Sequence, residues 1–168
     1  MGPQEAKVVA DFLLSTLDQE LKTTTAVLSA APVDKLGYQP DTKSKSALGL
    51  LRHLTLEDEW ILNAVADGKF GPMPDDSDAC GIMTTNDAAA CYARRIPAAI
   101  ARVRALSGEA LVRPIDFFGN MVPAIQVLSV MLRHSVHHRG QLSTYLRPMG
   151  GKVPSIYGPS ADTQMPAA

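Results

Sequence analysis

Apolar side chains recur at steps of three and four residues along four stretches of this chain, and polar segments rich in glycine or proline separate the stretches. The first stripe comprises Ala10, Leu14, Leu17, Leu21, Thr24 and Leu28. Because this spacing places side chains on one face of an α-helix, it predicts a long amphipathic helix over about residues 4–30. Pro32 predicts where that helix ends.

The second helix is expected to begin at Ser44 or Ser46, either of which can cap its first turn, and to run to about Asp67, where Gly68 stops it. The segment that follows, DGKFGPMPDDSDACGIM, is rich in glycine, proline and aspartate. This composition is too irregular for a helix or a strand. We expect a crossover loop that carries the chain from one end of the molecule to the other.

Two further helices are predicted in the second half of the chain. The third runs from about Asn86 to Ser107, and Pro97 in its interior removes one backbone hydrogen bond and predicts a kink. The segment SGEALVRPIDFFGN is expected to be an irregular connection, and no stretch shows the alternation of a strand. Asn120 and Pro123 then open a fourth helix that lasts to about Leu146.

Residues 148–168 are predicted to form a C-terminal strap. Pro148, Gly150 and Gly151 end the fourth helix, and the remaining residues have no apolar period. We expect an extended segment that lies over the surface and frays at its end. The fold class is therefore all-α.

Composition narrows the set of partners and compartments. The 168 residues are 46% hydrophobic, which predicts a single domain over residues 1–168. Sixteen basic residues against 17 acidic ones, without a basic run, disfavour nucleic acid and anionic membranes as partners. The first residues, MGPQEAK, lack the apolar run of a signal peptide, so we expect a cytoplasmic protein. Cys80 and Cys91 are interpreted as reduced bystanders.

The stretch RHSVHHRGQ holds three of the four histidines of the chain. On a helix, His138 lies about 40° from His134, whereas His137 lies about 60° away on the other side. The apolar residues of the fourth helix project toward the side of His138. His134 and His138 are therefore predicted to face the interior as a pair one turn apart, and His137 to face solvent or a partner.

The second helix repeats this arrangement with His53 and Glu57. Both lie beside the apolar arc of that helix, whereas Arg52 is expected on its polar side. Burying a polar group without a partner costs about 1–3 kcal/mol, so three histidines and a carboxylate need hydrogen bonds, water or a cation. A divalent metal satisfies three imidazoles together and keeps a position open. Ordinary hydrogen-bonded core histidines are the alternative, because His-x-x-x-His alone is a weak signal.

Two segments resemble a known family. LLRHLTLEDEW and, some eighty residues later, LRHSVHHRGQLSTYLRPMGGKVPSIYGPSAD are similar to the DinB/YfiT-like superfamily of metalloenzymes. The resemblance implies a four-helix bundle with a long crossover between helices two and three, and frequently a homodimer. It implies a zinc-like or nickel-like divalent ion on His53, His134 and His138. Some relatives are transferases or isomerases that use a low-molecular-weight thiol such as bacillithiol, mycothiol or glutathione.

We therefore hypothesise a metal-dependent enzyme whose open metal position accepts a thiol or water. Its expected substrate is a small molecule such as a low-molecular-weight thiol. Transfer of a thiol is favoured over hydrolysis by family analogy alone. A metal-dependent hydrolase remains an alternative. So does a non-catalytic metal-binding or ligand-sensing bundle, in which the crossover loop or the His137 side contacts a partner.

Four further residues have two interpretations each. Glu57 could orient His53, accept a proton, or pair with Arg139. Gln141 could bond to a metal ligand or substrate, or only border the core. Tyr157 could close over the site or anchor the strap. Gly140 favours close backbone packing over a neutral position, because glycine costs about 1 kcal/mol in a helix.

Overall fold

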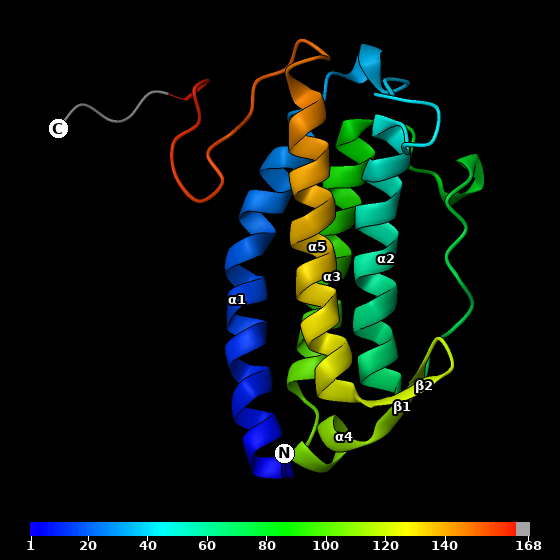
Figure 1. Ribbon diagram of the computed structural model, residues 1–168, viewed down its shortest axis with the longest axis vertical. Helices are drawn as coiled ribbons and strands as arrows, with labels where there is room; N and C mark the ends of the chain where they lie inside the picture. Colours follow the sequence, from blue (N-terminus) through cyan, green and yellow to red (C-terminus); the bar gives the residue numbers. More distant parts are fainter. Residues whose placement is uncertain (164–168) are drawn as a thin grey trace, which may run out of the picture.

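The computed structural model describes residues 1–163, and these residues are mostly helical. Four long helices lie side by side, with α1 and α2 each contacting both α3 and α5 (Figure 1). Residues 164–168, where fraying is expected, lie outside the described part. The long helices are α1 (Pro3–Ser29), α2 (Ala47–Asp67), α3 (Thr85–Arg104) and α5 (Ala124–Leu146).

The helix boundaries follow local signals in the sequence. Ser46, one of the two expected caps, accepts a hydrogen bond from the backbone N–H of Gly49 and begins α2. Gly68 ends α2 in the left-handed region with φ 77°. Thr84 and Asp87 form a reciprocal capping box that begins α3 one residue before the expected start. A short 3-10 turn, η1 (Val33–Lys35), follows α1.

Residues 68–84 run along the outside of the helices and return the chain to the end from which α2 began (Figure 1). The predicted crossover loop is confirmed, and it contains the 3-10 turn η2 (Asp78–Cys80). The loop also corrects one expectation. Arg52 is buried under this loop. Its guanidinium donates hydrogen bonds to the carbonyls of Ile82 and Asp76 and to the carboxylate of Asp78. A helical wheel considers one helix alone, so it does not show that a loop buries Arg52.

The connection before α5 is regular, and the expectation of an irregular segment was wrong. It contains α4 (Gly108–Val112) and a hairpin of β1 (Pro114–Phe117) and β2 (Asn120–Pro123). The fourth long helix accordingly begins at Ala124 rather than near Asn120. Strands of four residues are too short to show an alternating pattern, which explains why the sequence did not indicate them.

The hairpin turns through Phe118 and Gly119, which both have positive φ, 52° and 85°. Two such residues between paired strands are typical of a type I′ turn, for which Asn-Gly or Asp-Gly is the preferred pair. A non-glycine residue in the left-handed region costs about 1–2 kcal/mol. Phe118 is an unusual choice at this position, and it is 70% exposed.

Helix α3 continues through Pro97 from Thr85 to Arg104. Pro97 and Ala93, the residue whose carbonyl loses its helical partner, are both exposed. Water can therefore satisfy the free carbonyl. Among residues 1–163, no helix is long and apolar enough to cross a membrane.

The four long helices share one hydrophobic core, which includes the α1 residues Ala10, Leu14, Leu17 and Leu28. After α5, residues 148–163 form neither helix nor strand, as expected of the strap. Val153 and Ile156 of this segment pack against the core.

Candidate metal centre

Three of the four histidines meet where α2 contacts α5. His53 comes from α2, and His134 and His138 come from successive turns of α5. Nε2 of His53 lies 2.9 Å from Nε2 of His138 and 3.2 Å from Nε2 of His134. The three side chains each offer a ligand atom within 4.8 Å of the others, a separation that one metal ion can bridge.

The second nitrogen of each ring faces an oxygen. Nδ1 of His134 lies 3.0 Å from Asp58 Oδ1, and Nδ1 of His138 lies 3.0 Å from Gln141 Oε1. Nδ1 of His53 lies 2.6 Å from Glu57 Oε1. Such oxygens fix the tautomer of a metal-binding histidine, because they hold the proton on Nδ1 and leave Nε2 free.

This arrangement fits a cation. If all three protons sit on Nδ1, the Nε2 lone pair of His53 faces those of His138 and His134 at 2.9 and 3.2 Å, and none of the three can donate. A tetrahedral zinc ion holds two nitrogens at ~2.1 Å each, which separates them by roughly 3.4 Å. The observed separations are close to this value. The residues present therefore suit a divalent ion.

Without an ion, a proton has to fill the same role. Burial lowers the pKa of His134, but hydrogen bonds to Asp58 and Glu57 outweigh burial and raise it to about 9. Burial lowers the pKa of His138 to about 4, and the neighbouring histidines act in the same direction. Burial raises the pKa of Glu57, but hydrogen bonds from His134 and His53 overcome it and hold it at about 2. The cluster thus attracts one positive charge.

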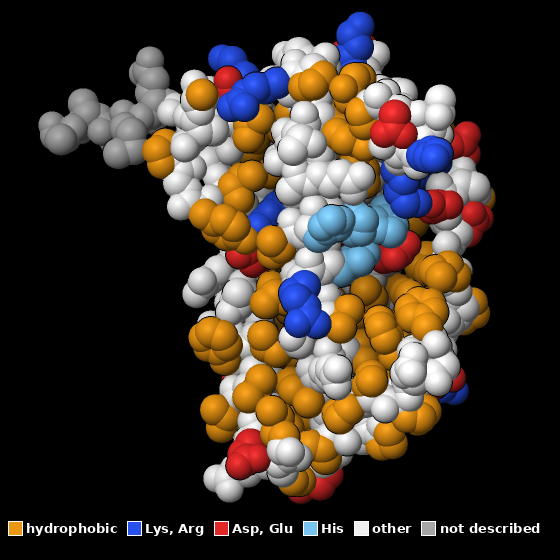
Figure 2. Space-filling view, viewed as in Figure 1, with side chains coloured by type: hydrophobic (Ala, Val, Ile, Leu, Met, Phe, Trp, Pro, Cys, Tyr) orange, Lys and Arg blue, Asp and Glu red, His pale blue; other side chains and the backbone are white. Residues whose placement is uncertain are grey.

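The site opens to solvent on one face. Figure 2 shows the histidine side chains at the surface of the molecule, with acidic and apolar side chains beside them. The side chains of His134 and Glu57 are 16% and 26% exposed. His137 is exposed, as expected, and does not belong to the group of three, although its ring centroid lies 4.8 Å from that of His138.

The model of the DinB family matches residues 6–165. The chain belongs to the DinB family. The resemblance noted from the two histidine segments is thereby confirmed. Protein YjoA of Bacillus subtilis is 26% identical over 150 residues, which are 88% of this chain and 92% of YjoA. Protein YrdA of the same organism is 40% identical over 48 residues, 29% of each chain.

Solved structures of DinB-like proteins share the fold. A DinB-like protein from Bacillus cereus superposes with a TM-score of 0.73 at 22% identity, covering 86% of this chain and 95% of that one. The structure of B. subtilis YjoA superposes with a TM-score of 0.66 at 25% identity, covering 91% of this chain and 99% of YjoA.

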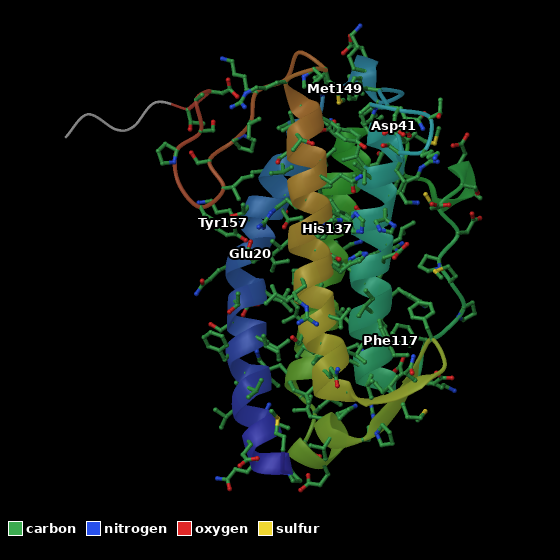
Figure 3. The ribbon with its side chains drawn as sticks, in the orientation of Figure 1. Glu20, Asp41, Phe117, His137, Met149 and Tyr157 are labelled. Carbon is green, nitrogen blue, oxygen red and sulfur yellow. The ribbon has the colours of Figure 1, made fainter. Side chains whose placement is uncertain are left out.

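In this DinB protein the sequence-predicted residues fall into two groups. Glu57 and Gln141 contact the histidines, at His53 and His138 respectively. Tyr157 lies elsewhere, on the strap beside Glu20 of α1, so it anchors the strap and does not close over the site (Figure 3).

One alternative for Glu57 is excluded, because Arg139 binds Glu20 and Thr24 of α1 and does not pair with Glu57. The expectation of close packing at Gly140 was wrong. Gly140 is not closely packed, since a Cβ atom placed there meets nothing within 4 Å.

Sequence reasoning missed Asp58. This carboxylate is fully buried, accepts from the Tyr92 hydroxyl at 3.0 Å, and contacts His134 with its other oxygen. The Tyr92 hydroxyl also lies 3.4 Å from Ser135 Oγ. A signal was present: on the wheel of α2, Asp58 lies about 140° from His53, at the edge of the apolar arc.

Proposed function

We propose that this DinB protein is a divalent-metal-dependent enzyme that transfers a low-molecular-weight thiol to a small-molecule substrate. The observation that carries the metal site is the meeting of three Nε2 atoms whose Nδ1 partners are all oxygens. The choice of a thiol transferase rests on family analogy. We also infer that the four long helices constitute the four-helix bundle of the family.

His53, His134 and His138 would hold the ion, and three neutral imidazoles suit zinc or nickel. When bound, such an ion supplies Lewis acidity at an open position and lowers the pKa of a thiol or water there. Glu57 borders that position, because its Oε2 lies 3.5 Å from Nε2 of His134. Its carboxylate is thus placed to receive a proton that a thiol gives up, while its other oxygen orients His53.

The metal assignment can be tested by elemental analysis of single variants. We expect His53→Ala, His134→Ala and His138→Ala each to lose most of the bound metal, because two imidazoles do not complete the site. His137→Ala is the matched control, and its metal content should be unchanged, since His137 is exposed. Full occupancy in any of the three variants would remove that residue from the site.

A second experiment separates catalysis from a structural role. In cobalt-substituted protein, added thiols should change the visible spectrum in a saturable way, because three protein ligands leave a position open. A screen of the zinc- and nickel-loaded protein with thiols and model electrophiles should then show turnover. A spectrum that ignores thiols would favour the non-catalytic bundle, and turnover of esters or amides without thiol would favour a hydrolase.

We further propose that the protein is a homodimer that pairs through faces away from the metal site. One such face carries the exposed side chains of Val8 and Phe12 on α1. Light scattering at tens of micromolar should give twice the 18.0 kDa mass of the chain. A monomer mass would contradict the proposal.

A further inference from the structure

Four of the nine tryptophan, tyrosine and phenylalanine side chains gather at one place, between α2 and the β hairpin. Trp60, the single tryptophan of the chain, packs on Phe70 with ring centroids 4.6 Å apart. Phe70 in turn lies 5.8 Å from Phe117 and 6.2 Å from Phe118. Phe117 is labelled in Figure 3 at the end of the molecule where the hairpin lies. Three of the four phenylalanines are therefore in this cluster.

Beside the cluster lies a half-open pocket of about 170 Å³. Its walls are Trp60, Phe70, Met73, Asp116 and Phe118. This volume equals roughly five or six water molecules at ~30 Å³ each, which suits a group of about five non-hydrogen atoms. We call these five residues the aromatic cage.

Asp116 gives the cage a negative charge. One of its oxygens accepts a hydrogen bond from the backbone N–H of Gly119 at 2.7 Å, within the hairpin turn. Among residues 1–163, Asp116 has no lysine, arginine or histidine nitrogen within 4.0 Å. The carboxylate is exposed and free to face a ligand.

The backbone holds Phe118 in place at a cost. Phe118 takes a left-handed conformation, φ 52°, that asparagine, aspartate or glycine would adopt more easily. Its side chain gains little burial in return, because Phe118 remains 70% exposed. Strain of this kind is typical of positions kept for a ligand.

We propose that the aromatic cage binds a small organic cation with a methylated ammonium head. Aromatic faces attract a cation through their quadrupole, and weakly hydrated quaternary ammonium groups gain most from such faces. The thioether of Met73 is a polarisable wall for the methyl groups. The carboxylate of Asp116 adds the charge that distinguishes a cation from a neutral group of the same shape.

This site is separate from the metal centre. Among residues 1–163, no hydrogen bond, ion pair or aromatic ring pair joins a cage residue to His53, His134 or His138. The proposal does not depend on the metal-dependent activity. Trp60 lies three residues after Glu57 on α2, one helical turn away. A bound cation with a longer tail would therefore extend toward the metal face of the same helix.

The test uses the full, metal-loaded chain and two probes of equal shape. Choline carries a trimethylammonium head, and 3,3-dimethylbutan-1-ol carries a neutral tert-butyl head. Saturation transfer from aromatic protons to the probe methyl groups reports binding in NMR, and the emission of Trp60, the single tryptophan, reports its place. At constant ionic strength we expect choline to bind about fivefold more tightly or better. Equal binding of the two probes would overturn the proposal.

Two variants locate the site, and each keeps the hairpin. Asp116→Asn retains an oxygen for the Gly119 N–H, and Phe118→Asn suits the left-handed backbone. Each should weaken choline binding about threefold or more, with an unchanged circular dichroism spectrum. Asp34→Asn, at an exposed carboxylate of η1 outside the cage, is the matched control for Asp116→Asn and should bind as the parent does. Unchanged binding in both cage variants would overturn the proposal, and so would loss of binding after the metal is chelated.

Discussion

His138 and Arg139 are neighbours on α5, yet they enter two polar clusters of opposite kinds. His138 faces α2, where its Nε2 meets that of His53 and no hydrogen-bond donor is left between them when the Nδ1 atoms carry the protons. Arg139 faces α1, where its guanidinium donates to Glu20, Thr24 and the Tyr157 hydroxyl. The polar groups of the Arg139 cluster pair with one another, whereas the facing Nε2 atoms of the histidine cluster lack a partner.

This difference is a guide to function. A buried polar group costs free energy unless it is paired, so a protein keeps such groups either as paired structural links or for a ligand that pairs them. The Arg139 cluster joins α1, α5 and the strap with charges that balance. The histidine cluster lacks a positive charge, which a proton or a metal ion must supply. If the two clusters are separate, substitutions at Arg139 change stability and substitutions around the histidines change metal binding.

The largest effect is expected at the structural cluster. Arg139 is 1% exposed, and Arg139→Met would remove the positive charge that pairs with the carboxylate of Glu20. Breaking one side of a buried ion pair typically costs about 3–5 kcal/mol of unfolding free energy. Urea denaturation should show a loss of about 3 kcal/mol, since the Glu20 side chain keeps 12% exposure. Metal content of the folded protein should not change.

The double variant Arg139→Met, Glu20→Met is the control for that experiment. It removes both charges and should regain much of the lost stability, because no unpaired charge remains. A single variant that instead loses its metal while keeping its stability would show that the two clusters are not separate.

The next effect is expected at Asp58, which links the metal centre to the core. Asp58→Asn removes the negative charge beside Nδ1 of His134 at a fully buried position. Loss of such a supporting group typically lowers metal affinity 10–100-fold. Competition with a chelating dye should detect a decrease of about this size. Asp67→Asn, at the exposed end of the same helix, should leave the affinity unchanged.

Metal binding should also release a proton. Hydrogen bonds to Asp58 and Glu57 outweigh burial and raise the pKa of His134 to about 9, so at pH 7 the ion has to displace a proton from it. Apparent affinity should therefore rise by about tenfold per pH unit from pH 7 and level off above about pH 9. Calorimetry in buffers of different ionisation enthalpy should count about one proton released at pH 7. Release that stays near zero at pH 7 would exclude His134 as a protonated site.

Much of this molecule was accessible from periodicity alone. The stripes of α1 and α2, the cap at Ser46, and the inward pair His134 and His138 all follow from 3.6-residue spacing, because a long helix averages over many positions. The prediction of a metal site on His53, His134 and His138 needed the further step that buried imidazoles require a partner, together with the family resemblance. Neither inference requires knowledge of which helices pack against each other.

The failures share another cause. Asp58 lies about 140° from His53 on α2, and Arg139 lies about 140° from His134 on α5, where a helical wheel changes from apolar to polar. Their burial depends on Tyr92 of α3 and Glu20 of α1, which are distant in the sequence. Arg52 is buried by the crossover loop. Burial by segments distant in the sequence depends on the tertiary structure, so the spacing of residues within one helix does not predict it.

The smallest effect is expected at Gly140, which directly follows His138 and Arg139 on α5. A Cβ atom there meets nothing within 4 Å, so Gly140→Ala should keep the backbone and remove the flexibility of glycine. We expect a gain in unfolding free energy of up to about 1 kcal/mol, measured by urea denaturation. Metal content and choline binding should stay the same, because neither cluster is touched. A loss of stability would mean that α5 packs closely at this turn, and the open position found here would then be wrong.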